Sequence, residues 1–215
     1  MTATATETTV FEHADLRLAV QYDDSVLVPR AWTAAQSAWA RRVLAARPGA
    51  RVLELCAGVG HIGQLAVLHS GHRLVCVDRD ARACAYASRN AVANGLAGQV
   101  EVRCVPLAEA VRPDERYEVV VADPPWVPSA DCGRFPEDPL GAIDGGPEGT
   151  AVARECVRVA DAVLPAGGVL LIQLRDVEQA ARLAETPEAQ RLTLSEIRTP
   201  EPGRGVLARF DREGA

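Results

Sequence analysis

The feature that most constrains this chain is a strand, a glycine loop, a helix and a strand in direct succession. Residues 51–55 form an apolar run that fits a buried strand, and the loop ELCAGVG at residues 54–60 leads into a helical pattern over residues 61–70. A second strand-like run, residues 74–77, ends at Asp78. Parallel strands joined by a helix need helices packed against the sheet, so this unit predicts an α/β fold.

The same alternation continues to the end of the chain. The other runs that read as strands are residues 100–105, 117–122, 169–174, 191–198 and 206–210, and the other helical patterns are residues 32–47, 81–93, 150–164 and 176–184. The last two strands follow one another and predict an antiparallel hairpin. We therefore expect a Rossmann-like, doubly wound, seven-stranded and mostly parallel sheet, with helices on both faces and an antiparallel C-terminal edge hairpin.

The helix expected at residues 81–93 carries clear boundary signals. Asp80 is a good N-cap, and Asn94-Gly95 closes the pattern. The residues expected on its inner face are Cys84, Ala87, Ser88, Ala91 and Val92. Earlier in the chain, residues 16–28 read as two short strands around a turn at residues 23–25.

Composition and charge exclude several classes of protein. Lys plus Arg is 23 and Asp plus Glu is 29, giving a net charge of −6, whereas a protein that grips nucleic acid alone usually has a basic excess. None of the six cysteines forms a C-x-x-C pair, so we expect no metal site and buried free thiols in a reducing cytoplasm. No run approaches the roughly 20 apolar residues of a membrane span, and the first nine residues do not resemble a signal peptide.

The glycine loop has the features of a nucleotide-cofactor site. Glycines allow the backbone to turn sharply at the positive N-terminus of a helix, and Asp78, 18 residues after Gly60, is placed to bind a ribose diol. A nicotinamide site uses the same geometry. Two details favour S-adenosylmethionine (SAM): Cys56 takes the first place of a G-x-G-x-x-G pattern, and Glu54 at the mouth of the loop would repel a pyrophosphate while suiting a sulfonium and an ammonium group.

A second candidate site follows the strand expected at residues 117–122. Asp123, Pro124, Pro125 and Trp126 lie where ligands bind in open α/β sheets, outside the carboxyl ends of the strands. The Asp123 carboxylate and the Pro124 carbonyl can each accept one hydrogen bond from an NH₂ group, and Trp126 can stack on a flat group. Such a clamp would hold a nitrogen in line with a sulfonium methyl group. The alternative is a proline-rich loop with a core tryptophan.

These residues resemble a known family, the class I SAM-dependent methyltransferases, and within it the HemK-type release-factor glutamine N5-methyltransferases. The family motif Asn-Pro-Pro-Tyr-(Ile/Val)-Pro corresponds to residues 123–128, and its Asp-Gly-Gly-x-(Asp/Glu)-Gly segment corresponds to residues 144–149. The family's Val-Leu-(Ile/Val)-Pro-Arg segment corresponds to residues 26–30, with Thr33 in its threonine position. The resemblance covers roughly residues 20–175.

The chain departs from this family at four positions and in one domain. Asp123 replaces Asn and Trp126 replaces Tyr, a pairing that also resembles amino-group methyltransferases acting on adenine or guanine. Pro106 stands where an acid would meet the adenine amino group, and Ala34 stands where the bacterial family has Glu. We expect no counterpart of the N-terminal helical domain of the bacterial enzymes.

The hypothesis is therefore a SAM-dependent N-methyltransferase that acts on a planar amide or amino nitrogen, foremost a protein glutamine. The alternatives are an exocyclic amino group of RNA or DNA, a small-molecule metabolite, or a non-catalytic SAM-fold subunit. The catalytic candidates are Asp123, Pro124, Pro125 and Trp126, and the cofactor-binding candidates are Glu54, Cys56, Ala57, Gly58, Gly60, Asp78, Arg79, Thr33 and Asp123. We expect a release-factor-like protein substrate, or else a nucleic acid or small molecule, and a cytoplasmic monomer or homodimer without membrane contact.

Three further assignments concern organisation. We expect a disordered tail at residues 1–9, an N-terminal hairpin and lid helix at 10–48, and a SAM-binding methyltransferase domain at 49–215, in one globular unit. Trp32 and Trp39 are assigned to the core, although Trp32 and Thr33 lie where they would cover a cofactor, and His61 is assigned to the surface or to packing. The loop at residues 129–143 is expected to set substrate choice.

Overall fold

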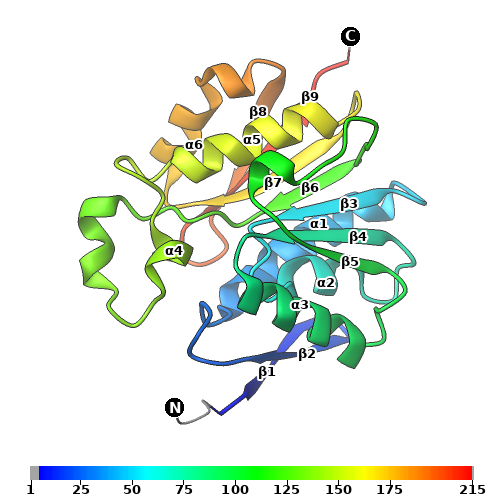
Figure 1. The fold of residues 1–215 in the computed structure, drawn as a ribbon. Coiled ribbons are helices and arrows are strands. Elements are labelled where there is room, and N and C mark those ends of the chain that lie inside the picture. The colour runs from blue at the N-terminus through cyan, green and yellow to red at the C-terminus, as the bar shows by residue number, and fades with distance from the viewer. Residues whose placement is uncertain (1–4, 215) are drawn as a thin grey trace.

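A computed structural model describes residues 5–214 of the chain. Within this range the predicted sheet is confirmed: seven strands in the order β5-β4-β3-β6-β7-β9-β8, all parallel except for the antiparallel pairs β7–β9 and β8–β9 (Figure 1). The strands are β3 (Arg51–Leu55), β4 (Arg73–Asp78), β5 (Val100–Cys104), β6 (Val119–Ala122), β7 (Val169–Leu174), β8 (Leu192–Arg198) and β9 (Val206–Arg212). The helices are α1 (Ala34–Ala45), α2 (His61–Val67), α3 (Ala81–Ala93), α4 (Leu140–Ile143), α5 (Ala151–Val163) and α6 (Val177–Ala184), with short 3₁₀ turns at η1 (Ala31–Thr33), η2 (Leu107–Glu109), η3 (Ser129–Arg134) and η4 (Pro187–Ala189).

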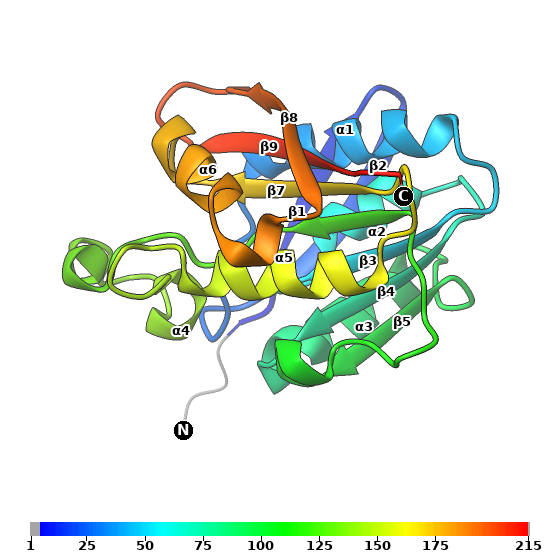
Figure 2. The same ribbon diagram turned by 90° about the horizontal axis from the view of Figure 1, so that it is seen from above.

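Helices cover both faces of the sheet, as the near-continuous apolar strands require. Helices α5 and α6 pack on one face against residues such as Leu53 and Val120, and α1 and α2 pack on the other against residues such as Val52 and Val121 (Figure 2). Alternate residues of β3 and β6 therefore point to opposite layers, as the two-residue period of a strand dictates. Helix α1, which we expected to act as a lid, packs on the sheet with Trp39 buried.

The N-terminal hairpin exists, but its position was predicted incorrectly. Strand β1 (Glu7–His13) pairs antiparallel with β2 (Leu16–Tyr22), so residues 7–9 are a strand and not a disordered tail, while residues 1–4 of that predicted tail lie outside the described range. The turn at residues 23–25 is local, with the Asp23 carboxylate accepting a hydrogen bond from the Ser25 amide at 2.9 Å. It does not form a hairpin because the alternating apolar residues of β2 already find their partner upstream.

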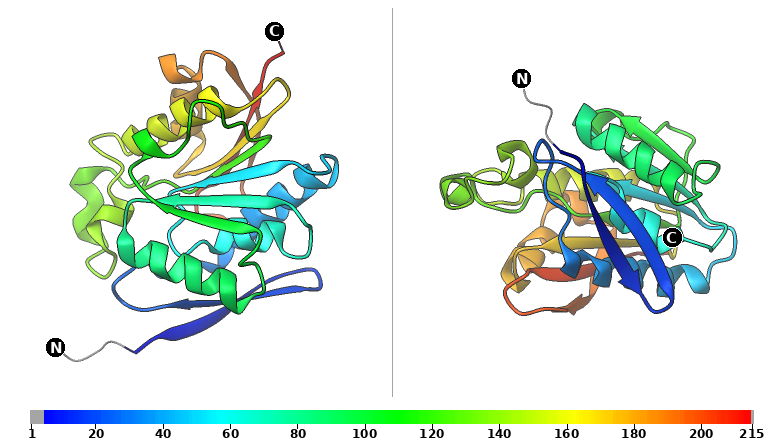
Figure 3. Two further views of the ribbon diagram at one scale, coloured as in Figure 1. Left: turned by 45° about the vertical axis from the view of Figure 1, so that its right-hand side comes forward. Right: turned by 90° about the horizontal axis from the view of Figure 1, so that it is seen from below.

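The hairpin lies against α3 (Figure 3), and the side chains of Asn90 on α3 and of its C-cap residue Asn94 hold it there. Asn90 Oδ1 accepts from the Gln21 amide at 2.8 Å, and Asn94 Oδ1 accepts from the Ala19 amide at 3.0 Å. These side chains satisfy backbone groups at an edge of β2 that would otherwise be open to pairing. The docking explains why the inner face of α3 differs from the prediction: Ser88 and Val92 are exposed, Val92 at 66%, and the buried residues are Ala83, Cys84, Tyr86, Ala87, Asn90 and Ala91.

The N-cap prediction for α3 is confirmed and yields a stability prediction. The Asp80 carboxylate accepts from the amides of Arg82 at 2.7 Å and Ala83 at 3.2 Å. Asp80→Ala removes this acceptor and is expected to lower the free energy of unfolding by about 1 kcal/mol. Asp80→Asn keeps an acceptor oxygen and should retain most of the capping stabilisation. Urea denaturation of the ligand-free protein measures both. Asp114→Ala, at another exposed aspartate, is the control; an equal loss there would refute the capping role.

Candidate active site

The two predicted sites meet at the centre of the sheet. Leu55, the last residue of β3, is the parallel partner of Ala122, the last residue of β6. The loops that follow these strands therefore leave the sheet side by side. The chain order reverses here, from β5-β4-β3 on one side to β6-β7 on the other, and such a switch point opens a crevice outside the carboxyl ends of the strands. The expectation that both loops face one crevice is confirmed.

That crevice is a cavity of about 580 Å³, within the roughly 300–1,000 Å³ common for small-ligand sites. Four groups of segments line it. They are the strand-end loops (Cys56–Val59, Asp78–Asp80, Val105–Leu107, Asp123 and Pro125), the segment before α1 (Ser25–Arg30 and Thr33), the starts of helices (His61, Ile62, Ala83, Val152 and Glu155), and the loop around α4 (Pro139, Gly141 and Ala142).

The backbone of the glycine loop enters the left-handed region at three residues, two of which are glycines. Gly58 and Gly60 have φ of 53° and 77°, and Cys56 has φ of 55°, all in the left-handed region. A Cβ on Gly58 would meet nothing within 4 Å, whereas one on Gly60 would lie 2.6 Å from Gln64 Nε2. Cys56, Ala57 and Gly58 line the cavity, while Gly60 starts α2 outside the lining.

Asp78 is held rigidly at the cavity wall. Its Oδ2 accepts from the Gly58 amide at 2.8 Å and its Oδ1 accepts from the Asp80 amide at 2.9 Å. Each carboxylate oxygen keeps a further lone pair for a ligand donor. Burial raises the pKa of Asp78. These features fit the ribose of a nucleoside cofactor, and Arg79 and Thr33, two other predicted cofactor residues, also line the cavity.

Glu54 does not lie at the mouth of the loop, and this part of the prediction is wrong. Its side chain is 2% exposed and lies beneath α2, where Oε1 accepts from the Gly63 amide at 3.0 Å and Oε2 accepts from the Cys76 thiol at 3.1 Å. Burial raises the pKa of Glu54 to about 7. Because residues alternate along β3, Glu54 points into the layer of α1 and α2 and braces the loop from below.

The clamp residues divide into two pairs. Asp123 and Pro125 line the cavity, and burial raises the pKa of the half-buried Asp123 to about 7. Pro124 is buried behind them, outside the lining. Trp126 also lies outside the lining: its side chain packs against Val127, Cys132 and Ile143. In this arrangement Trp126 is therefore not placed to stack on a ligand inside the cavity, contrary to the expectation.

The segment at residues 144–149 supports the clamp from behind. Asp144 forms a parallel bridge with Val127, and the Gly145 amide donates to the Val127 carbonyl at 2.9 Å. A Cβ on Gly145 would lie 2.7 Å from the Pro125 carbonyl oxygen, and one on Gly149 would overlap the Trp126 carbonyl oxygen. The glycines of this motif are thus needed for close backbone contact.

Gln179, on α6, connects these two segments and was not identified from the sequence. Its Nε2 donates to the Gly149 carbonyl at 2.9 Å and to the Trp126 carbonyl at 3.3 Å, and its side chain is fully buried. A buried glutamine far along the chain carries no local pattern, so only the fold reveals this role.

His61 was assigned to the surface or to packing; it packs against Phe11, with the ring centroids 4.7 Å apart, and it also lines the cavity. It is 8% exposed, and its Nε2 lies 2.8 Å from Thr33 Oγ1, which itself donates to the Arg30 carbonyl at 2.7 Å. The hydroxyl proton is thus used, so the histidine ring donates from Nε2. Burial lowers the pKa of His61 to about 3, so the ring is neutral at physiological pH.

Two arginines tie the loop at residues 129–143 to the cavity. Arg30 Nη2 donates to both carboxylate oxygens of Asp138, at 2.6 and 2.9 Å, and the Asp138 side chain is only 9% exposed. Arg79 Nη2 donates to the Gly141 carbonyl at 2.9 Å. These contacts draw Pro139, Gly141 and Ala142 over the cavity.

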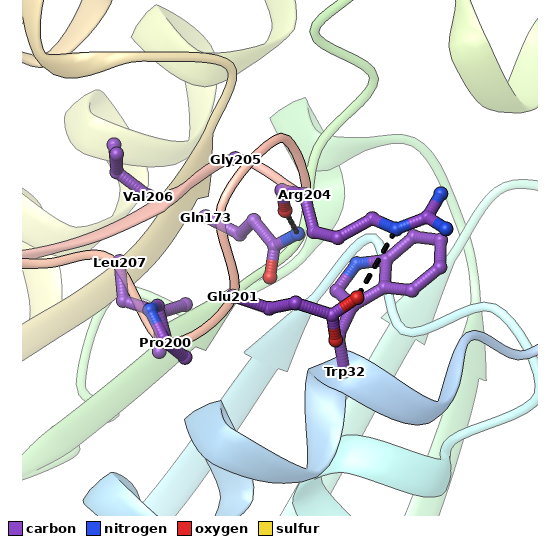
Figure 4. Close-up of a pocket in the computed structure, with 8 residues that line it drawn as sticks. All are labelled: Trp32, Gln173, Pro200, Glu201, Arg204, Gly205, Val206 and Leu207. Atoms are coloured by element: carbon purple, nitrogen blue, oxygen red, sulfur yellow. Dashed lines mark hydrogen bonds and ion pairs between the residues drawn. The ribbon is translucent and has the colours of Figure 1, made fainter.

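Trp32 does not belong to the lining of the main cavity; it borders a small hollow next to the β8–β9 loop (Figure 4). Its ring is half-buried, with the Arg204 guanidinium 4.6 Å and the Arg30 guanidinium 5.9 Å from the ring centroid. Gln173 and Glu201 border the same small hollow. Trp32 therefore joins the β8–β9 loop to the segment before α1, whereas Trp39 is in the core as predicted.

The prediction of buried cysteines is confirmed for four of the six. All six cysteines are free, and Cys76, Cys84, Cys132 and Cys156 are buried. Cys104 is exposed, because it ends the edge strand β5. Cys56 is partly exposed at the cavity, with its sulfur 3.8 Å from that of Cys156.

The fold and the site together define the class: the chain belongs to the family of SAM-dependent methyltransferases, whose cofactor is S-adenosylmethionine. More particularly, residues 37–133 match the family described as MTS, methyltransferase small domain. Among relatives, the chain is 33% identical over 172 residues to the ribosomal protein uL3 glutamine methyltransferase of Bordetella pertussis, covering 74% of this chain and 56% of that protein. It is 32% identical over 168 residues to the release factor glutamine methyltransferase of Gloeobacter violaceus, covering 73% and 57%.

Solved structures agree on the fold. The catalytic domain of hMettl16 in complex with MAT2A 3′UTR hairpin 1 aligns with a TM-score of 0.72 at 15% identity, covering 91% of this chain and 74% of that one. SMU.776, solved in complex with SAH, aligns with a TM-score of 0.70 at 13% identity, covering 95% and 56%. The chain spans little more than half the length of the curated relatives that it matches. Across the described residues, no helix has the length and apolar character needed to cross a bilayer.

Proposed function

We propose that the chain is a SAM-dependent N-methyltransferase that acts on a planar amide nitrogen, that of a glutamine side chain in a protein. One observation carries the proposal: a single cavity joins the nucleotide features of Gly58 and Asp78 to the hydrogen-bond acceptor Asp123. The relatives named for release factor and ribosomal protein uL3 support a protein of the translation machinery as acceptor, and hence action in the cytoplasm.

Bound S-adenosylmethionine supplies the methyl group, and the chain's own residues orient the acceptor. The Asp123 carboxylate, which lines the cavity, accepts one N–H of the amide. Fixing this hydrogen helps to direct the nitrogen lone pair, and such orientation contributes several kcal/mol to catalysis. The methylated nitrogen must then lose a proton. Asp123, whose pKa is raised to about 7, is a suitable base for it.

The raised pKa of Asp123 predicts a pH dependence. Below pH 7 the Asp123 carboxyl is protonated, so it cannot accept both the hydrogen bond from the amide N–H and the proton released on methylation. We therefore expect kcat/KM to rise with pH and to level off above about pH 8. A pH–rate profile with labelled SAM measures this. Asp123→Asn keeps an acceptor oxygen without a titrating group and should flatten the profile; a wild-type profile that is flat between pH 6 and 8 would contradict the proposal.

The acceptor can be identified directly. Purified protein is incubated with methyl-labelled SAM and, separately, with release factor, uL3 and total RNA, followed by mass spectrometry of the labelled product. Label on a glutamine of either protein, absent with Asp123→Ala, supports the proposal. Label confined to RNA would overturn the choice of acceptor.

One observation favours a second candidate, the exocyclic amino group of a nucleobase. A carboxylate only accepts hydrogen bonds, whereas an asparagine also donates to the carbonyl oxygen of an amide. Asp123 therefore suits an acceptor that presents donors, such as the amino edge of guanine or adenine. The net charge of −6 opposes this candidate, because binding to the phosphate backbone relies on basic residues.

A further inference from the structure

The end of the cavity that would hold the nucleoside base can be located from strand pairing. Asp78, the expected ribose ligand, is the parallel partner of Cys104 at the end of β5, and the Val105 amide donates to the Asp78 carbonyl at 2.9 Å. The chain that follows β5 therefore runs directly beside Asp78. A group attached to a ribose at Asp78, on the side away from the glycine loop, meets Val105, Pro106 and Leu107, all of which line the cavity.

These three residues offer no side chain that forms hydrogen bonds. Pro106 also lacks an N–H group, and its carbonyl already accepts from the Glu109 amide at 2.9 Å. Glu109 is the nearest carboxylate in the sequence, but it is exposed and does not belong to the lining. The side chains of the wall beside β5 are thus apolar where the edge of a base would lie.

The same region of the cavity also provides a planar group. Arg79 follows Asp78 directly, lines the cavity, and is fixed by its bond to the Gly141 carbonyl at 2.9 Å. A guanidinium stacks on aromatic faces. The other polar residue here, Asp80, is exposed, and its Oδ1 caps α3 through the amides of Arg82 and Ala83.

We propose that the chain holds the base of its cofactor by its faces, between Arg79 and the apolar wall of Val105, Pro106 and Leu107, and does not read the 6-amino group. The inference rests on the proposed SAM site. Holding the base by its faces makes the pocket tolerant of changes at position 6 of the purine, because no buried acceptor loses its partner when the amino group is removed.

Calorimetry without turnover tests this. The probes are S-adenosylhomocysteine and its 6-deamino analogue, in which hydrogen replaces the amino group. Wild-type protein is expected to bind the two with Kd values within about threefold. A tenfold or greater preference for the adenine compound would overturn the inference. Failure to bind S-adenosylhomocysteine at all would instead refute the proposed cofactor site, so the two failures are distinguishable.

Two variants sharpen the result. Pro106→Asp adds a carboxylate at the N-cap position of η2, where Asp is well tolerated, and should create a preference of about tenfold or more for the adenine compound. Arg79→Met keeps an apolar side chain but removes the planar group, and should weaken both compounds by the same factor. If Pro106→Asp is folded by circular dichroism yet shows no preference, the base does not lie where the inference puts it. If Arg79→Met weakens only the adenine compound, Arg79 reads the base edge and the inference is wrong.

Discussion

Asp123→Ala is expected to lower kcat for methyl transfer by about 10²- to 10³-fold, the usual range for loss of a group that both orients a nucleophile and takes its proton. The carboxylate lines the cavity at the end of β6, beside the glycine loop. Alanine leaves the cavity walls in place but removes the acceptor for the nitrogen's hydrogen. Single-turnover assays with labelled SAM measure the loss.

The controls separate chemistry from binding. S-adenosylhomocysteine should bind Asp123→Ala with a Kd near that of wild type, because Asp78 and the glycine loop are unchanged. Asp123→Asn should retain more activity than Asp123→Ala, since an amide oxygen still accepts a hydrogen bond. If Asp123→Ala keeps wild-type turnover, the clamp is not at this residue.

Gly149→Ala is expected to lower the free energy of unfolding by about 2–4 kcal/mol. It should also reduce activity when the assay is run at a low temperature at which the variant remains folded. Two costs add. Gly149 has φ of 72°, a left-handed conformation that L-residues disfavour, and its added Cβ would overlap the Trp126 carbonyl oxygen and lie 2.9 Å from Gln179 Nε2. Relief of the overlap must move the backbone that carries the clamp.

A matched glycine isolates the second cost. Gly203 has φ of 78°, but a Cβ there would meet nothing within 4 Å. Gly203→Ala should therefore lose only about 1–2 kcal/mol, with unchanged activity. Equal free energies of unfolding for the two variants, from urea denaturation, would show that the contact with Trp126 carries no cost.

The fold followed from the sequence because its signals are local. The buried strands of the sheet are short apolar runs, and the glycines and Asp80 mark the boundaries between elements. The hairpin was misplaced because residues 23–25 have turn chemistry, whereas the partner of β2 lies in a polar, threonine-rich segment at residues 7–13. The strand character of that segment depends on pairing with β2, which itself docks against α3.

The site was predicted less completely, for a different reason. The sequence identifies which loops meet but not which way each side chain points. Glu54 and Trp126 have suitable chemistry, yet the pleat of β3 and the packing around Val127 turn them away from the cavity. His61 and Gln179 gain their roles from partners 28 and 53 positions away, Thr33 and Trp126, and no spacing rule connects such pairs.

The tethering of residues 129–143 by Arg30 and Arg79 has a kinetic consequence. Arg79 lines the cavity and binds the Gly141 carbonyl, so whatever fills the cavity also influences the loop at residues 129–143. The cofactor is then expected to bind before the acceptor and to leave after it. If spent cofactor leaves past this loop, both tethers must break, and we expect its departure, rather than the methyl transfer itself, to limit turnover.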